Sequence, residues 1–151
     1  MTFRCFLPAW IAAWAVAVFL PSALIAWLGL SPAAAAIGTG FDHFPATTWR
    51  VADDVGPAVK LMIGGLLLLS FLGLLRSPLS GPGRRLAGGV ALGMAAMIAT
   101  IALVPPHLSR GFAAALTGAR FDGATLPLYL LGGALAGAAF VLSVERCRTR
   151  P

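Results

Sequence analysis

The chain has 151 residues, of which 59% are hydrophobic and only 11% are charged, with a formal net charge of +6. An average soluble domain is about 45–50% apolar and about 25% charged, so this chain has too few charges to cover a surface that faces water. The composition excludes a soluble globular domain and a disordered chain. It predicts an all-α integral membrane protein that forms a single domain over residues 1–151.

The first apolar run extends over residues 5–30 and contains no charged residue. About 20 residues cross the roughly 30 Å hydrocarbon core, so a span at about residues 6–30 must tilt or bend, and Pro21 is the expected kink. The alternative is a cleaved signal peptide, because small residues follow the run. Signal peptides have apolar regions of only about 7–15 residues, so we expect this run to be retained as a membrane helix.

Three further spans are predicted at about residues 57–75, 86–104 and 126–144, each near the length that crosses a bilayer. The turn between the second and third spans is short and holds two prolines and two glycines. The other two connections are longer. Within the second of them, apolar residues at positions 108, 112 and 116 predict a helix lying in the membrane interface at about residues 107–118.

Basic residues are distributed unequally between the two sides of the predicted bundle. The side with both termini and the short turn holds seven arginines, and the side with the two long loops holds four basic residues. Because Lys and Arg are enriched on the cytoplasmic side, we expect cytoplasmic termini, outward-facing long loops and a multi-pass protein of the cell inner membrane. Ten of the eleven basic residues are arginine, and alanine and glycine are abundant, which is typical of a GC-rich bacterial genome.

The two cysteines, Cys5 and Cys147, lie near opposite ends of the chain and are not part of a CxxC motif. Both fall on the side assigned to the reducing cytoplasm, where disulfides are rare. The sequence therefore predicts two free thiols.

A weak internal similarity relates the two long loops. Residues 33–42 align without gaps to residues 113–122, with six identities that include a Phe-Asp pair. One interpretation is a duplicated hairpin, residues 1–75 and 86–144, since repeats of this kind build membrane proteins. The alternative is a chance match, which is common in alanine-rich sequence.

Nearly all side chains capable of chemistry fall on the side of the long loops. The candidate polar site on this outer face consists of Lys60, Asp53, Asp54, Asp42, His43, His107 and Asp122. Histidines and carboxylates bind divalent metals or transfer protons, but no metal-binding spacing such as HExxH is present. The alternative is a solvated surface, in which Asp53 and Asp54 favour the positive end of the helix beginning near Pro57 and pair with Arg50. We assign no catalytic residue, no metal site and no cofactor.

Lys60 is the one ionisable residue inside a predicted span. Charges within the membrane are functional candidates by default. A lysine about one turn from the membrane surface can, however, extend its ammonium to the interface while its stem stays in lipid. We expect this arrangement, with an aspartate of the outer face as the partner.

Small residues recur at helical spacing within the spans. They include the helix-packing candidates Gly65, Gly73, Gly89, Gly93, Gly133 and Gly137. Small residues four positions apart let helix backbones approach closely, so we expect these faces to pack mostly within the chain.

These patterns predict a non-enzymatic subunit or accessory protein of a membrane complex, of a transporter for example. Its expected surroundings are the lipid bilayer and a membrane protein partner or further copies of itself, and no nucleic-acid motif is present. The alternative is a small membrane enzyme or metal-handling protein that uses the outer-face histidines and aspartates. The sequence names no substrate for either.

Overall fold

The computed structural model describes residues 3–30, 43–78, 81–104 and 124–149 of the chain. The elements in these ranges are five helices: α1 (Phe3–Trp27), α3 (Phe44–Asp54), α4 (Pro57–Arg76), α5 (Pro82–Leu103) and α7 (Leu126–Thr149). Four of them, α1, α4, α5 and α7, are long and apolar enough to span a membrane. This confirms the prediction of an all-helical chain with four candidate spans.

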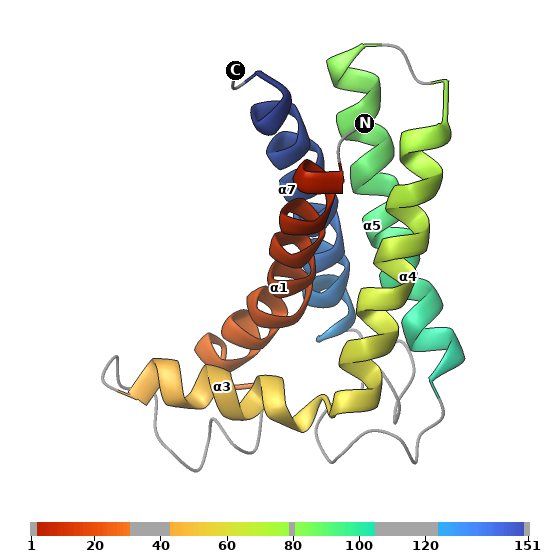
Figure 1. Ribbon diagram of the computed structural model, residues 1–151. Helices are drawn as coiled ribbons and strands as arrows, with labels where there is room; N and C mark the ends of the chain where they lie inside the picture. Colours follow the sequence, from red (N-terminus) through yellow and green to blue (C-terminus); the bar gives the residue numbers. More distant parts are fainter. Residues whose placement is uncertain (1–2, 31–42, 79–80, 105–123, 150–151) are drawn as a thin grey trace.

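The four long helices run side by side, and α3 crosses them at one end (Figure 1). The start of α1, the last turn of α7, the end of α4 and the start of α5 lie at the opposite end. We call these the α3 end and the terminal end. The predicted helix at 107–118 and the two similar segments, 33–42 and 113–122, lie outside the described residues.

Two of the spans begin by the same local device. Gly56 precedes α4 with φ 83°, and Gly81 precedes α5 with φ 98°. Each glycine is followed at once by a proline, Pro57 or Pro82, as the first helical residue. Glycine adopts positive φ without a steric cost, and proline at the first helical position lacks only an N–H that would have no partner within the helix. The Gly-Pro pairs therefore fix where both helices begin.

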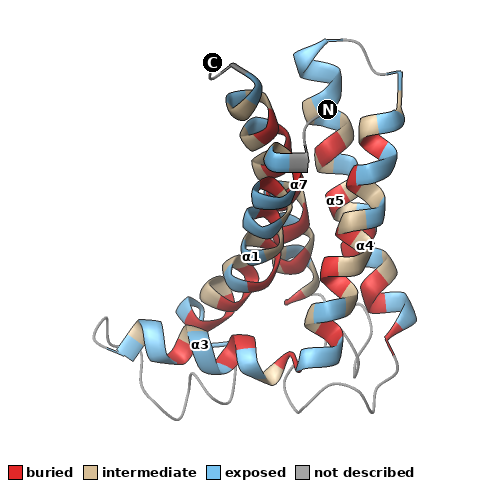
Figure 2. Cartoon of the chain, in the orientation of Figure 1, coloured by how far each residue is buried: buried red, intermediate tan, exposed pale blue. Residues whose placement is uncertain are grey.

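The helix α7 is the centre of the bundle, because it packs extensively against both α1 and α5. The helix α4 lies against α5, and its contact with α1 is much smaller. Buried side chains line the faces that the long helices turn toward one another, and exposed side chains cover the outward faces (Figure 2). Most of the exposed large side chains on the spans are leucines and isoleucines, as expected of a surface in contact with lipid.

The helix α1 continues through Pro21, where the sequence predicts a kink. Proline has no N–H to donate to the carbonyl four residues earlier, which here belongs to Ala17. The glycine Gly132 of α7 packs against both groups: a Cβ added there would lie 2.6 Å from the Pro21 ring and 3.6 Å from the Ala17 oxygen. Close packing against α7 thus covers the place where α1 lacks a hydrogen bond.

The helix α3 occupies part of a segment that the sequence analysis treated as a connection between spans. Its buried residues are Thr47, Val51 and Ala52, and Pro45 lies in its first turn, where proline is favoured. Trp49 stacks on Phe19 of α1, with ring centroids 5.7 Å apart. The buried positions have helical spacing in the sequence, but the segment is short and too polar overall to resemble a membrane span.

Glycines bring α5 and α7 into backbone contact. A Cβ added at Gly93 would collide with the carbonyl oxygen of Gly133, and one added at Gly137 would collide with that of Gly89. These four residues form two GxxxG motifs that face each other within the chain. Backbones at this distance gain dispersion and Cα–H···O contacts that larger residues would prevent.

Aromatic side chains fill the space between α1, α4 and α7. Phe71 of α4 stacks on Phe140 of α7 with centroids 4.0 Å apart, and Phe6 of α1 meets Phe140 edge to face at 5.6 Å. Lower on α1, the parallel rings of Trp10 and Trp14 lie 5.6 Å apart. Large rings therefore occupy the region where α1 and α4 have few other contacts.

Candidate functional site

Lys60 lies in the first turn of α4, at the α3 end. Its Nζ is 3.6 Å from Oδ1 of Asp53, near the end of α3. The lysine side chain is 26% exposed and the aspartate side chain is 72% exposed. The ammonium therefore reaches a carboxylate at the surface, as expected of a lysine whose stem alone is buried.

The other members of the predicted outer-face site are less closely grouped. Asp54 is half-buried, and His43 is exposed and precedes α3 without a side-chain capping bond. Asp42, His107 and Asp122 lie outside the described residues. No group of three or more metal-ligating side chains occurs within the described part of the chain.

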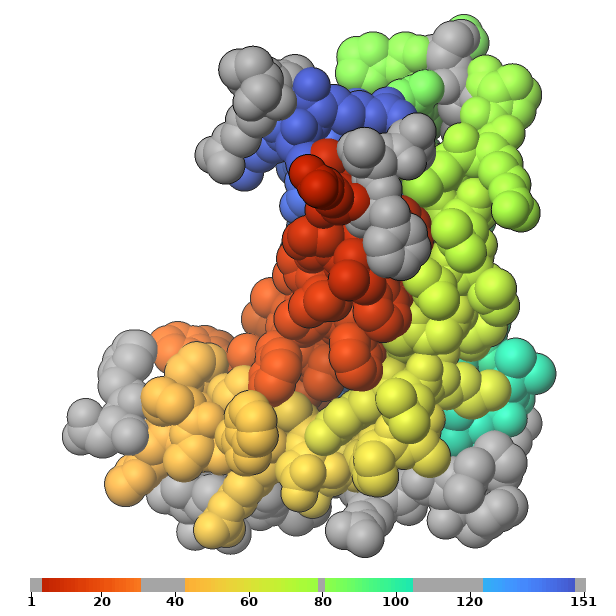
Figure 3. Space-filling model, in the orientation of Figure 1, coloured from red at the N-terminus to blue at the C-terminus, as the bar shows by residue number. Residues whose placement is uncertain are grey.

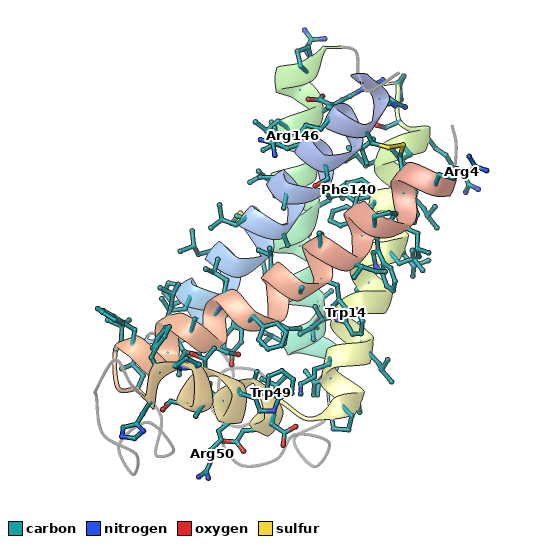
Figure 4. The ribbon with its side chains drawn as sticks, turned by 60° about the vertical axis from the view of Figure 1, so that its left-hand side comes forward. Arg4, Trp14, Trp49, Arg50, Phe140 and Arg146 are labelled. Carbon is teal, nitrogen blue, oxygen red and sulfur yellow. A yellow bond between two sulfur atoms is a disulfide. The ribbon has the colours of Figure 1, made fainter. Side chains whose placement is uncertain are left out.

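Two contacts near Lys60 and Asp53 differ from those that the sequence predicts. Gly56 has no side chain with which to cap α4, and its N–H donates to the backbone oxygen of Asp53 at 2.9 Å. Arg50 points away from the bundle (Figure 4), and Asp53 pairs with Lys60. The aspartates still lie just before the N-terminus of α4, where a negative charge interacts favourably with the positive end of the helix dipole.

Trp14 connects this region to α1. Its indole Nε1 donates to the backbone oxygen of Lys60 at 2.9 Å, and that of Trp10 donates to Gly64 at 3.0 Å. Figure 4 shows Trp14 reaching from α1 toward α4. This role could not be predicted from the sequence, because nothing local to either tryptophan indicates which backbone carbonyl it will meet.

The expectation of two free thiols is wrong. Cys5 and Cys147 form a disulfide at the terminal end, with their Cα atoms 5.8 Å apart. That separation lies within the usual range for a disulfide of about 4.4–6.8 Å. The long contact between α1 and α7 brings the two residues together although 142 positions separate them in the sequence, so no local spacing could indicate the pair.

A small cavity of about 40 Å³ opens between α4, α5 and α7 at the terminal end. Its apolar lining consists of Leu74, Leu75, Phe140, Val141 and Val144. Three charged residues complete the lining: Arg85 from α5, and Glu145 and Arg148 from α7. From the sequence, these charges indicate only the orientation of the chain in the membrane. Their proximity could not be predicted, because α5 and α7 are far apart in sequence.

A larger groove of about 410 Å³ runs between α4 and α5. Several of its lining residues are small, namely Ser70, Gly73, Ser77, Gly88 and Ala91. A Cβ added at Gly73, or at Gly65 on the same helix, would meet no atom within 4 Å. The predicted packing glycines thus divide into two classes: those of α5 and α7 lie in a helix contact, and those of α4 do not.

Figure 3 shows α3 adjoining the first turns of α4 on one face of the molecule. No protein-family model matches this chain, and no match was found among curated proteins or solved structures. Three features of the described residues could serve a function: the Lys60–Asp53 pair, the α4/α5 groove and the cavity at the terminal end.

Proposed function

We propose that this chain is a non-enzymatic subunit of a membrane complex and that it binds a transmembrane helix of a partner subunit in the α4/α5 groove. The observation that carries the proposal is the contrast between the two sets of glycines. Gly89 and Gly93 of α5 pack against Gly133 and Gly137 of α7, whereas Gly73 borders an open groove and a Cβ added there would meet no atom within 4 Å.

The chemistry of the groove supports a helix as its occupant. Small residues on a membrane-facing surface allow a second backbone to approach closely, and dispersion and weak hydrogen bonds then stabilise the contact. Leu69 and Leu92 also line the groove and supply larger apolar surface beside the small residues. Serine hydroxyls of Ser70 and Ser77 lie in the same lining.

Native mass and copurification test the proposal. The full chain, purified in a mild detergent, should carry a second membrane protein, and Gly73→Leu should reduce the recovered partner at least tenfold. Gly65→Leu is the matched control, because Gly65 is on the same helix, is equally free of contacts and does not line the groove. Recovery of the 15.5 kDa chain alone from its native membrane would contradict the proposal, and so would equal partner recovery with Gly73→Leu.

We further propose that the termini face the cytoplasm of a bacterial inner membrane, because the sequence assigns seven basic residues to the side of the termini and four to the side of the long loops. The redox state of the Cys5–Cys147 disulfide depends on this orientation, since disulfides persist mainly in oxidising compartments. With cytoplasmic termini, the bond should be reduced in growing cells and should form on oxidation.

Two single-cysteine variants, His43→Cys and Ser80→Cys, each made with Cys5 and Cys147 replaced by serine, test the orientation. In intact cells an impermeant thiol reagent should label position 43 and not position 80. Labelling at position 80 alone would reverse the orientation and place the disulfide in the oxidising compartment.

A further inference from the structure

The cavity at the terminal end combines two kinds of surface. Its floor is formed by aliphatic and aromatic side chains of α4 and α7, including the buried Phe140. Arg85, Arg148 and Glu145 also line the cavity and are more exposed than most of the apolar residues, so they form its rim. An apolar floor beneath a charged rim fits an amphiphile better than it fits a small soluble ion.

The position of the cavity places the charged rim where lipid headgroups lie. Arg85 is in the first turn of α5, Arg148 is in the last turn of α7, and Leu75 is one residue from the end of α4. All three helices are candidate membrane spans. In a bilayer that these helices cross, their ends would lie in the interfacial region and their apolar middles in the hydrocarbon core.

The charge around the cavity is strongly positive. Among the described residues, the terminal end carries six arginines and a single acid, Glu145. The arginines are Arg4, Arg76, Arg84, Arg85, Arg146 and Arg148. Two of the six line the cavity, where they can converge on one bound group.

We propose that this cavity binds an anionic phospholipid, with the phosphodiester between Arg85 and Arg148 and the first apolar groups of the lipid on the floor. Guanidinium matches the geometry of phosphate oxygens with paired N–H donors. Basic pockets between membrane helices are a recurrent form of headgroup site. Arg85 also has a contact within the protein, and its five N–H donors leave capacity for a ligand.

Glu145 makes the rim selective. Two guanidiniums and one carboxylate give the lining a net charge of +1, which a single phosphodiester neutralises. A headgroup with two or more exposed negative charges would be repelled by the carboxylate. Because Glu145 repels the bound anion, Glu145→Gln should increase affinity for a singly charged lipid.

The test is a titration of the full chain in neutral detergent with phosphatidylglycerol, followed by native mass spectrometry, and phosphatidylcholine is the comparison lipid. We expect phosphatidylglycerol to bind at least tenfold more tightly. Arg85→Gln with Arg148→Gln should reduce that preference to less than threefold. Arg76→Gln with Arg84→Gln is the matched control, because both arginines are exposed at the same end and neither lines the cavity; it should retain the preference.

Each remaining outcome supports or overturns the proposal. Equal loss in both double variants would show attraction to the general charge of this end and would overturn the site. Complete competition by millimolar inorganic phosphate would identify a soluble-anion site and overturn the lipid assignment. Weaker binding with Glu145→Gln would overturn the anionic headgroup in favour of an amine. Should the Arg85 variant fail to fold, Arg148→Gln alone, at an exposed position, must lower the affinity at least threefold.

Discussion

The two helix contacts on either side of the bundle are built in opposite ways. Between α5 and α7, the backbones of four glycines approach so closely that a Cβ added at any of them would collide with the other helix. Between α1 and α4, two indole rings separate the helices and donate hydrogen bonds to backbone carbonyls. The first contact depends on the absence of side chains, and the second depends on two of the largest side chains in the protein.

The difference determines how each contact should respond to substitution. A backbone cannot move aside without displacing its whole helix, so a side chain added between α5 and α7 must separate them. A bulky ring can rotate, or a smaller side chain can replace it, while the helices stay in place. The contact between α1 and α4 should therefore weaken gradually. This contact is also smaller in extent, which makes α1 more dependent on α7 and on the disulfide.

The largest effect is expected at the glycine contact. Gly93→Leu should lower the free energy of unfolding by about 3 kcal/mol or more, because overpacking without room to relax exceeds the usual 1–3 kcal/mol. Unfolding of the purified protein in mixed micelles measures the effect. Gly65→Leu is the control and should change stability by no more than about 0.5 kcal/mol, since its Cβ meets no atom within 4 Å. Equal stability of the two variants would rule out the helix contact as the role of Gly93.

Loss of the disulfide should have the next largest effect. Cys5→Ser with Cys147→Ser should lower stability by about 2 kcal/mol, at the low end of the typical range, because helices that remain in the bilayer limit the freedom of the unfolded chain. Comparison of the oxidised and reduced wild-type protein in the same assay provides the control. A double variant as stable as the oxidised protein would show that packing alone holds α1 against α7.

The tryptophan contact should respond moderately. Trp14→Phe removes the N–H that donates to Lys60 and retains an aromatic ring, so a loss of about 1 kcal/mol is expected, as for other hydrogen bonds between membrane helices. Trp49→Phe is the matched control, because Trp49 is 65% exposed and phenylalanine can still stack on Phe19. A loss at Trp14 as large as that at Gly93 would contradict the distinction between the two contacts.

The smallest effect is expected at the Lys60 side chain. Lys60→Gln removes a pair with a largely exposed aspartate, and such pairs contribute about 1 kcal/mol or less. The backbone oxygen that accepts from Trp14 remains, so the contact between α1 and α4 should persist.

The same variant tests the alternative function of the outer face. Lys60→Gln, Asp54→Asn and His107→Ala should each retain full activity in a complementation assay if the chain acts as a helical subunit. Loss of activity at normal protein level in all three would favour an enzyme or metal-handling protein. Comparison with Gly73→Leu in the same assay separates the two functions.

The sequence alone determined the four candidate spans and, to within one residue, both ends of α4, the end of α5 and the start of α7. The other four ends differ from the prediction by three to five residues, and α5 begins at Pro82 where residue 86 was expected. Apolar length and the Gly56-Pro57 pair are local signals that act on the backbone where they occur. The helix α3 was missed in spite of its apolar spacing, because it is short and owes its burial to α1. The unequal distribution of arginines was also readable, because it depends only on their order along the chain.

Tertiary structure decided which of several equivalent residues meet. Gly93 and Gly65 look alike in sequence, yet a Cβ added at Gly93 would collide with another backbone and one added at Gly65 would meet no atom within 4 Å. The reason is that the rotation of each helix about its axis is set by the whole bundle. The same holds for the choice of Asp53 beside Lys60, for the disulfide and for the arginines of the cavity. These contacts join helices that are distant in sequence, and their geometry exists only after the helices have packed.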